Sequence, residues 1–197
     1  TRWSLIFIAL ATGVAVAGYV GKAPPAIPGI RAELSLGLVT AGWVVSIFSA
    51  MGSVSGMMVG AVADRIGRVK MVLYALGIIA FGSILGSQAH SASILLLSRL
   101  IEGAGYIGSM AILPVLIARL ASDQHRGLAV SLWSSVIPFG MAIAMVASPA
   151  ILEPVGWRGL WLVTAGFAVF FLLLAGFAFR GIDTHTPKNI EPYWANI

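Results

Sequence analysis

The stretch GAVADRIGRVK, residues 60–70, joins two long apolar runs and is the most densely charged part of the sequence. Gly60 precedes Asp64 by four residues, and a small residue at such a helix position lets a neighbouring helix approach closely. Gly67 permits a tight turn, because glycine adopts backbone angles that other residues avoid. The basic residues around it would hold the loop at an anionic membrane surface. The stretch therefore predicts a short charged turn between two helices at the surface of a membrane.

The composition of the whole chain indicates a membrane protein. Of the 197 residues, 59% are hydrophobic and 10% are charged, and the mean hydropathy is +0.97. A soluble domain carries about 25% charged residues. The net charge of +5 is expected to reflect the loops that stay inside the cell rather than nucleic-acid binding. A nucleic-acid-binding domain, a secreted disulfide framework and a cytosolic enzyme are excluded as classes.

Six apolar runs are each long enough to cross a bilayer as a helix, which takes about 17 to 25 residues. They cover residues 3–20, 39–62, 71–87, 94–118, 127–152 and 157–179. A strand-built barrel would alternate apolar and polar residues in segments of about ten, and these runs do not alternate. We therefore expect an all-α membrane protein with a six-helix transmembrane bundle in residues 1–180. Residues 181–197 would form a cytoplasmic polar tail, whose Tyr193-Trp194 pair is either a headgroup anchor or part of a docking segment.

The distribution of basic residues predicts the orientation, because loops rich in lysine and arginine stay in the cytoplasm. With both termini cytoplasmic, that side holds Arg2, Arg65, Arg68, Lys70, Arg119, Arg126, Arg180 and Lys188, and the outer side holds Lys22, Arg31 and Arg158. We therefore expect an integral protein of the plasma (inner) membrane with both termini inside.

The pattern GxxxDRxGRxK, formed by Gly60, Asp64, Arg65, Gly67, Arg68 and Lys70, resembles the signature loop of the major facilitator superfamily. A generic turn on the cytoplasmic side would explain the basic residues, but neither the aspartate nor the glycines. The resemblance implies a gating role for the loop, in which Asp64 engages the end of a helix of the other half in one transport state. An anion near a helix N-terminus gains about 0.3 to 1 kcal/mol, so Asp64 would bias an equilibrium.

The helix before this loop carries Gly52, Gly56 and Gly60 at intervals of four residues. Such a stripe lets two helix backbones approach closely inside a membrane. We expect it to be a helix-packing face, and in the superfamily this helix slides against a helix of the other six-helix half.

Arg99 lies inside the fourth apolar run, where an arginine costs about 2.5 to 3.5 kcal/mol on insertion scales. Glu102 follows three residues later on the same helical face and is expected to pair with it. Gly103 and Gly105 narrow the helix beside these charges. The run RxxEGxG resembles a second signature of the superfamily, which implies a cavity arginine with a role in proton coupling or substrate contact. A structural ion pair that pins the first and fourth helices is the alternative.

Lys22 and Pro138 are candidate substrate contacts. Lys22 lies near the external mouth, where it could attract an anion, although snorkelling to water is the favoured expectation. Pro138 breaks the fifth run and could free backbone groups for a cavity, but a packing kink is the favoured expectation. Residues 133–140, the Arg99 run and the GWRGLW start of the sixth run most resemble the cyanate-permease-like branch, whose members handle small anions. The two tryptophans of that start are expected at the outer interface.

The resemblance covers residues 3–180 and matches the N-terminal half of a fold that ordinarily has twelve helices. We therefore expect a partner over the faces of the second and fourth helices: a second copy, a separate six-helix half, the remainder of a longer chain, or an unrelated membrane complex. One hypothesis is a half-size secondary transporter that moves a small solute, with an anion as one candidate class, by alternating access. The other is a structural or assembly subunit that no longer transports.

Enzymatic chemistry is not expected from this sequence. His90, His125 and His185 lie in separate loops on two sides of the membrane and could not share a metal ion. The chain has no cysteine and no phosphate-binding GxxxxGK loop. We therefore expect neither metal nor cofactor, and coupling would come from an ion gradient or from the solute's own gradient.

Overall fold

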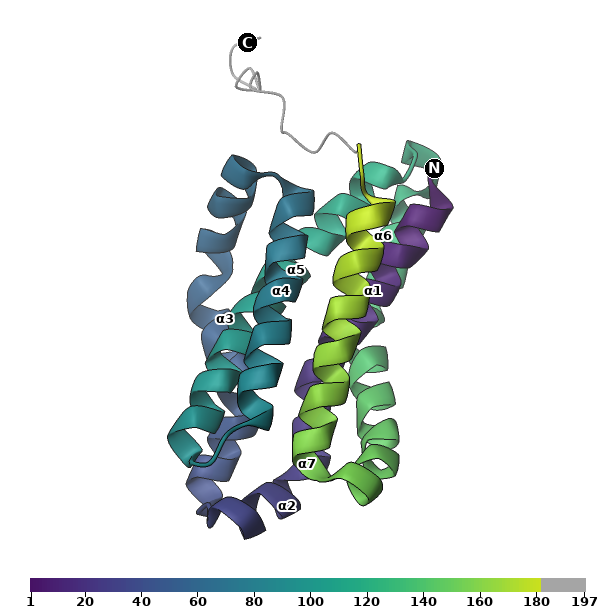
Figure 1. The fold of residues 1–197 in the computed structure, drawn as a ribbon. Helices are drawn as coiled ribbons and strands as arrows, with labels where there is room; N and C mark the ends of the chain where they lie inside the picture. Colours follow the sequence, from purple (N-terminus) through teal and green to yellow (C-terminus); the bar gives the residue numbers. More distant parts are fainter. Residues whose placement is uncertain (182–197) are drawn as a thin grey trace.

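The chain forms a bundle of long helices (Figure 1). The computed structural model describes residues 1–181, apart from the side chains of residues 53–64. The helices of this part are α1 (Trp3–Gly21), α2 (Ala23–Leu34), α3 (Leu38–Ile66), α4 (Arg68–Ser87), α5 (Ala92–Leu120), α6 (Asp123–Ser134) and α7 (Val136–Ala178). The all-helical fold predicted from the sequence is confirmed. The predicted tail from residue 182 onward lies outside the described residues.

Lys22 lies between α1 and α2, at the place where the first apolar run ends. Pro24 in the first turn of α2 lacks an N–H group, and at this position the missing donor breaks no helical hydrogen bond. Ser35 ends α2 in the left-handed conformation, with φ 51°. The first apolar stretch, Trp3–Leu34, is therefore longer than predicted, and Lys22 lies within it rather than just after it.

The turn predicted between residues 60 and 70 is present between α3 and α4. Gly67 has φ 92°, a backbone conformation that favours glycine. The side chain of Arg65 is exposed and Arg68 is only 9% exposed. Gly56, Gly60 and Asp64 contribute to the α3 backbone, but the gating role of Asp64 concerns a side chain outside the described ones.

The fifth predicted run departs from expectation at its break. The interruption falls at Ser135, between α6 and α7, and not at Pro138. Pro138 occupies the first turn of α7, where proline's missing N–H is not needed by the helix. Further on, Gly156 (φ 66°) interrupts α7, which divides it into an arm of residues 136–155 and an arm of residues 157–178.

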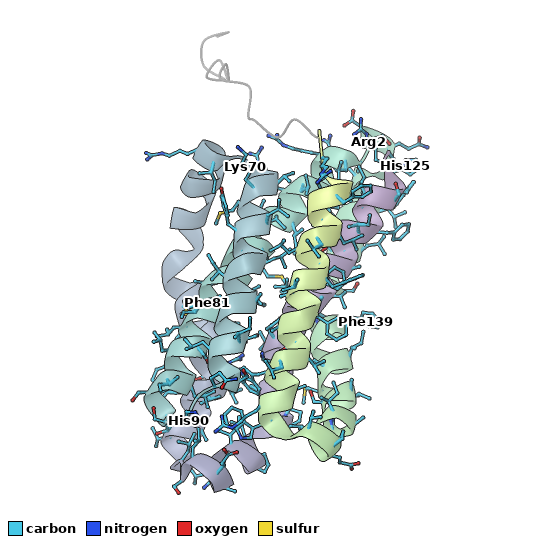
Figure 2. All side chains as sticks on the ribbon, viewed as in Figure 1. Arg2, Lys70, Phe81, His90, His125 and Phe139 are labelled. Carbon is cyan, nitrogen blue, oxygen red and sulfur yellow. The ribbon has the colours of Figure 1, made fainter. Side chains whose placement is uncertain are left out.

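Among the described residues, four helical stretches are long and apolar enough to cross a membrane: Trp3–Leu34, Arg68–Ser87, Ala92–Leu120 and Asp123–Ala178. Arg2, Lys70 and His125 lie at one end of the bundle, and His90 lies at the other (Figure 2). This separation agrees with the sides assigned from the sequence. Six crossings and cytoplasmic termini stay predictions.

Glycine brings the central helices into backbone contact. A Cβ atom at Gly105 of α5 would collide with the carbonyl oxygen of Ala75 in α4, and one at Gly140 of α7 would collide with that of Val14 in α1. Small residues allow such close approach where helices pack in a membrane. These contacts fix α1, α4, α5 and α7 around the charged residues described next.

Candidate functional site

Three charged side chains meet in the interior of the bundle. The Nζ atom of Lys22 lies 2.7 Å from Oε1 of Glu102, and Nη1 of Arg99 lies 2.5 Å from Oε2 of the same carboxylate. All three residues are 0% exposed. The pairing of Arg99 with Glu102 was predicted from their spacing, whereas the approach of Lys22 was not. One carboxylate thus holds two cations, which come from the end of α1 and from α5.

Neutral groups complete the hydrogen bonding of this cluster. Lys22 donates to Oγ of Ser83 at 3.2 Å and to Oγ1 of Thr164 at 2.9 Å, and the Ser83 hydroxyl in turn donates to Glu102. Arg99 donates to two backbone carbonyls, those of Val44 and of residue 19, each at 3.1 Å. The cluster therefore joins α1, α3, α4, α5 and the second arm of α7.

Aromatic rings and glycines build the walls of the cluster. Lys22 Nζ lies 4.4 Å from the ring centre of Trp161, and the Arg99 guanidinium lies 4.2 Å from that of Phe48. Both distances are within the range of cation–π attraction. Gly86 leaves room for Trp161, because a Cβ atom there would collide with its indole ring. The rings stabilise positive charge without supplying a negative one.

The cluster carries a formal charge of +1, from two cations and one carboxylate. Moving an ion from water into the protein interior costs several kcal/mol. The single carboxylate of Glu102 offsets this cost for one ion pair and leaves the second cation without an anion of its own. Ionisable residues inside a membrane usually mark a pathway for ions or substrates. A structural ion pair that joins α1 to α5 would need only one cation. The second cation is thus the unusual feature of the cluster.

Two expectations were wrong at this site. Lys22 does not snorkel to water, because Glu102, Ser83 and Thr164 together offer its ammonium group three partners inside the bundle. Trp161 does not lie at the outer interface but is 0% exposed, next to Lys22. The sequence around Lys22 did not indicate whether its side chain extends to water or pairs inside the bundle.

The other predicted site residues lie apart from the cluster. Pro138 is exposed and takes no part in it. Gly103 packs closely against Met51, and Gly105 packs against α4, so both glycines act in helix packing. Gly52 is exposed, and a Cβ atom there would meet nothing within 4 Å. Its packing partner is thus not found among the described residues.

A second polar cluster, which the sequence did not predict, lies at the end of the bundle that the basic residues assign to the outer side. Arg158 lies 2.7 Å from Glu33 and donates to the backbone carbonyls of Ser87 and Ala89. The indole N–H of Trp157 also donates to Glu33, at 2.7 Å. These bonds, which we call the outer clasp, tie the second arm of α7 to α2 and to the α4–α5 turn. Nothing in the local sequence pairs residues more than 120 positions apart.

No group of three or more potential metal ligands is found within the described part of the chain. The model of the Major Facilitator Superfamily matches residues 3–195. The chain belongs to this superfamily.

Similar proteins carry transporter names. The glucose transporter GlcP of Staphylococcus epidermidis is 30% identical over 89% of this chain and 39% of its own length. The probable metabolite transport protein CsbC of Bacillus subtilis is 29% identical over 97% of this chain and 45% of its own. A bacterial homolog of the human lysosomal transporter Spinster, solved in an inward-facing and unoccupied conformation, has a TM-score of 0.77 at 19% identity and supports the fold. The match covers 46% of the length of that solved protein. This chain therefore spans less than half the length of each of these three proteins.

Proposed function

We propose that this chain is one six-helix half of a secondary carrier, which moves a small solute by alternating access together with a second six-helix half. The two halves belong either to separate chains or to one longer chain. The buried cluster of Lys22, Arg99 and Glu102 is the observation that carries the proposal, because a scaffold has no use for a second buried cation. Membership of a transporter superfamily and the names of the relatives support it.

The charge of the cluster favours an anionic solute. An anion that replaced the Thr164 hydroxyl as an acceptor of the Lys22 ammonium would bring the formal charge of the cluster from +1 to zero. A charge-assisted hydrogen bond is about twice as strong as a neutral one. In this proposal Arg99 orients Glu102, and Lys22 contacts the solute. Asp64 in the signature loop gates the cycle, as the resemblance of residues 60–70 implies.

The second half would cover the unpartnered surface of α3. In the described residues this surface includes Gly42 and Gly52, where a Cβ atom would meet nothing within 4 Å. Close approach of a partner helix would then supply the dispersion contacts that drive association in lipid. A larger complex of unlike subunits is the competing arrangement, and with it the role of a structural subunit.

Flux measurements test the proposal. The complete assembly, extracted from its source membrane, would be reconstituted in vesicles and offered small labelled anions and glucose. We expect anion flux that falls at least tenfold in Arg99→Ala and in Asp64→Asn. Arg126→Ala is the matched control, because this arginine is exposed and pairs only with Asp123 at the surface.

Unchanged flux in Arg99→Ala and Asp64→Asn would overturn the assigned roles. Native mass spectrometry of the extract tests the partner. Two copies, a further six-helix chain or one longer chain would support a carrier, whereas a fixed place in a complex of unlike subunits without flux would favour the structural role. The finer assignment to the cyanate-permease-like branch gains no support from the relatives, which are named for glucose and metabolite transport.

A further inference from the structure

An apolar cavity of about 500 Å³ lies between α1 and the two arms of α7. It follows α1 from Ala11 to Lys22, a distance of about 16 Å at the helical rise of 1.5 Å per residue. Its shape is therefore that of an elongated groove, and Lys22 lies at one end. We call it the α1–α7 groove.

The rim of the groove is apolar and open. Phe139 and Ile143 of the first arm are 59% and 46% exposed, and Phe167 of the second arm is 53% exposed. Phe139 lies on the outer side of the bundle (Figure 2). Both arms belong to a stretch that is apolar enough to cross a membrane. A hydrocarbon chain can therefore enter the groove from the side without passing through water.

The polar groups of the groove lie mostly towards the Lys22 end. Tyr19 donates to the backbone oxygen of Thr164, Thr164 donates to that of Trp161, and Ser148 donates to that of residue 144. The hydroxyl groups thus have internal partners, while the rest of the lining is apolar. A sugar has many hydroxyl groups that would lose their water here without replacement, at about 1 to 3 kcal/mol each.

The charge at the Lys22 end of the groove complements an anion. Lys22 lines the groove and belongs to the cluster whose two cations share one carboxylate. Thr164, which also lines the groove, lies 2.9 Å from the ammonium nitrogen. The ammonium already donates to Glu102, Ser83 and Thr164, so an anionic group at this end would replace the neutral Thr164 hydroxyl as its third acceptor and would balance the excess positive charge.

From these observations we propose that the α1–α7 groove binds a single-chain anionic amphiphile, with its hydrocarbon chain between the arms of α7 and its anionic group at Lys22. The proposal rests on the carrier function, because it names the class of solute that the carrier takes. It differs from the sugars named for the relatives in requiring a long apolar chain and one negative charge.

Quenching of tryptophan fluorescence tests this binding. The probes are 11-bromoundecanoate and the matched cation 11-bromoundecyltrimethylammonium, applied to the whole assembly in lipid nanodiscs. Bromine quenches at short range and is carried by the last carbon of each chain, so with the anionic group at Lys22 it lies towards the Ala11 end of the groove. Trp133, which packs against Gly13 near that end, is the expected reporter. Partitioning into lipid gives a non-saturable background for both probes. We expect a saturable component for the anion, with an affinity at least tenfold above that for the cation, as one charge-assisted hydrogen bond implies.

Two variants locate the site without disturbing the charged cluster. Ala147 is exposed on the first arm and lines the groove, so Ala147→Phe would fill it. Ala142 is exposed on the same arm but does not line the groove, so Ala142→Phe is its matched control. We expect the saturable component to weaken at least tenfold in the first variant and to persist in the second. Lys22→Met should remove the preference for the anion.

The outcomes separate this proposal from the carrier function. Equal quenching by the two probes, or saturable binding that survives Ala147→Phe, would overturn the groove as an anionic amphiphile site. Flux of small hydrophilic anions without binding of 11-bromoundecanoate would overturn the substrate class and leave the carrier function standing. Saturable, anion-selective binding without flux of any solute would support the groove and overturn the carrier.

Discussion

Glu102 should be the most costly charged residue of the buried cluster to replace, and its cost should depend on Lys22. Glu102→Gln keeps the shape of the side chain and an oxygen that can accept from Ser83, but it leaves Lys22 and Arg99 as two buried cations without an anion. Removing one partner of a buried ion pair costs about 3 to 5 kcal/mol. For a chain of this size each kcal/mol lowers the melting temperature by about 2 to 4 °C, so we expect a loss of about 10 °C.

Lys22→Met should cost much less, because it leaves Arg99 and Glu102 as a neutral pair. It removes hydrogen bonds to Ser83 and Thr164, a loss of about 1 to 2 kcal/mol. In the double variant Lys22→Met, Glu102→Gln, one of the two unpaired cations is gone. The double variant should therefore melt at a higher temperature than Glu102→Gln alone.

The assay is thermal unfolding of the purified protein in lipid nanodiscs, followed by tryptophan fluorescence. Glu33→Gln serves as a matched control, since Glu33 is 48% exposed in its pair with Arg158 and should cost less than about 1 kcal/mol. If Lys22→Met destabilises as much as Glu102→Gln, or if the double variant melts below Glu102→Gln, the cluster does not carry the excess positive charge inferred here.

The remaining predictions concern backbone contacts and the outer clasp. Gly140→Val should lower stability by about 1 to 3 kcal/mol, because its Cβ atom would collide with the carbonyl of Val14; Gly166→Ala, with nothing within 4 Å, should be neutral or slightly stabilising in the same melting assay. Gly67→Ala should cost about 1 to 3 kcal/mol, since φ 92° is strained for alanine, and unchanged melting would contradict that turn. Arg158→Met should increase proteolysis at the outer end by freeing the carbonyls that it bonds, and an unchanged digestion rate would count against the clasp.

Local patterns in the sequence predicted the all-helical fold and one ion pair correctly. Long apolar runs predict helices because every backbone polar group in lipid must be satisfied within the segment, and Gly67 marked the turn between two of them. Arg99 and Glu102 were paired correctly because they are one helical turn apart. The family followed from the motif in residues 60–70 and agrees with the matching model.

Local sequence patterns did not predict the contacts between distant segments. Lys22 reaches Glu102 across 80 residues, and Trp157 reaches Glu33 across 124 residues. In a chain that is apolar on all sides, helical spacing does not indicate which face meets which neighbour. The break at Ser135 was misplaced for a different reason, since proline marks an interruption but is also tolerated in the first turn of a helix.

The long sequence separations in the charged cluster and in the outer clasp also have a consequence for the growing chain. Lys22 leaves the ribosome well before Glu102, and Thr164 follows only with α7. A nascent chain that has inserted α1 alone therefore holds a lysine whose later partners do not yet exist. Because Trp157 and Arg158 begin the arm that carries Thr164, their attachment to α2 would align that arm as it arrives. Assembly of the charged interior would then be completed from the end that holds the clasp inward, after synthesis of α7.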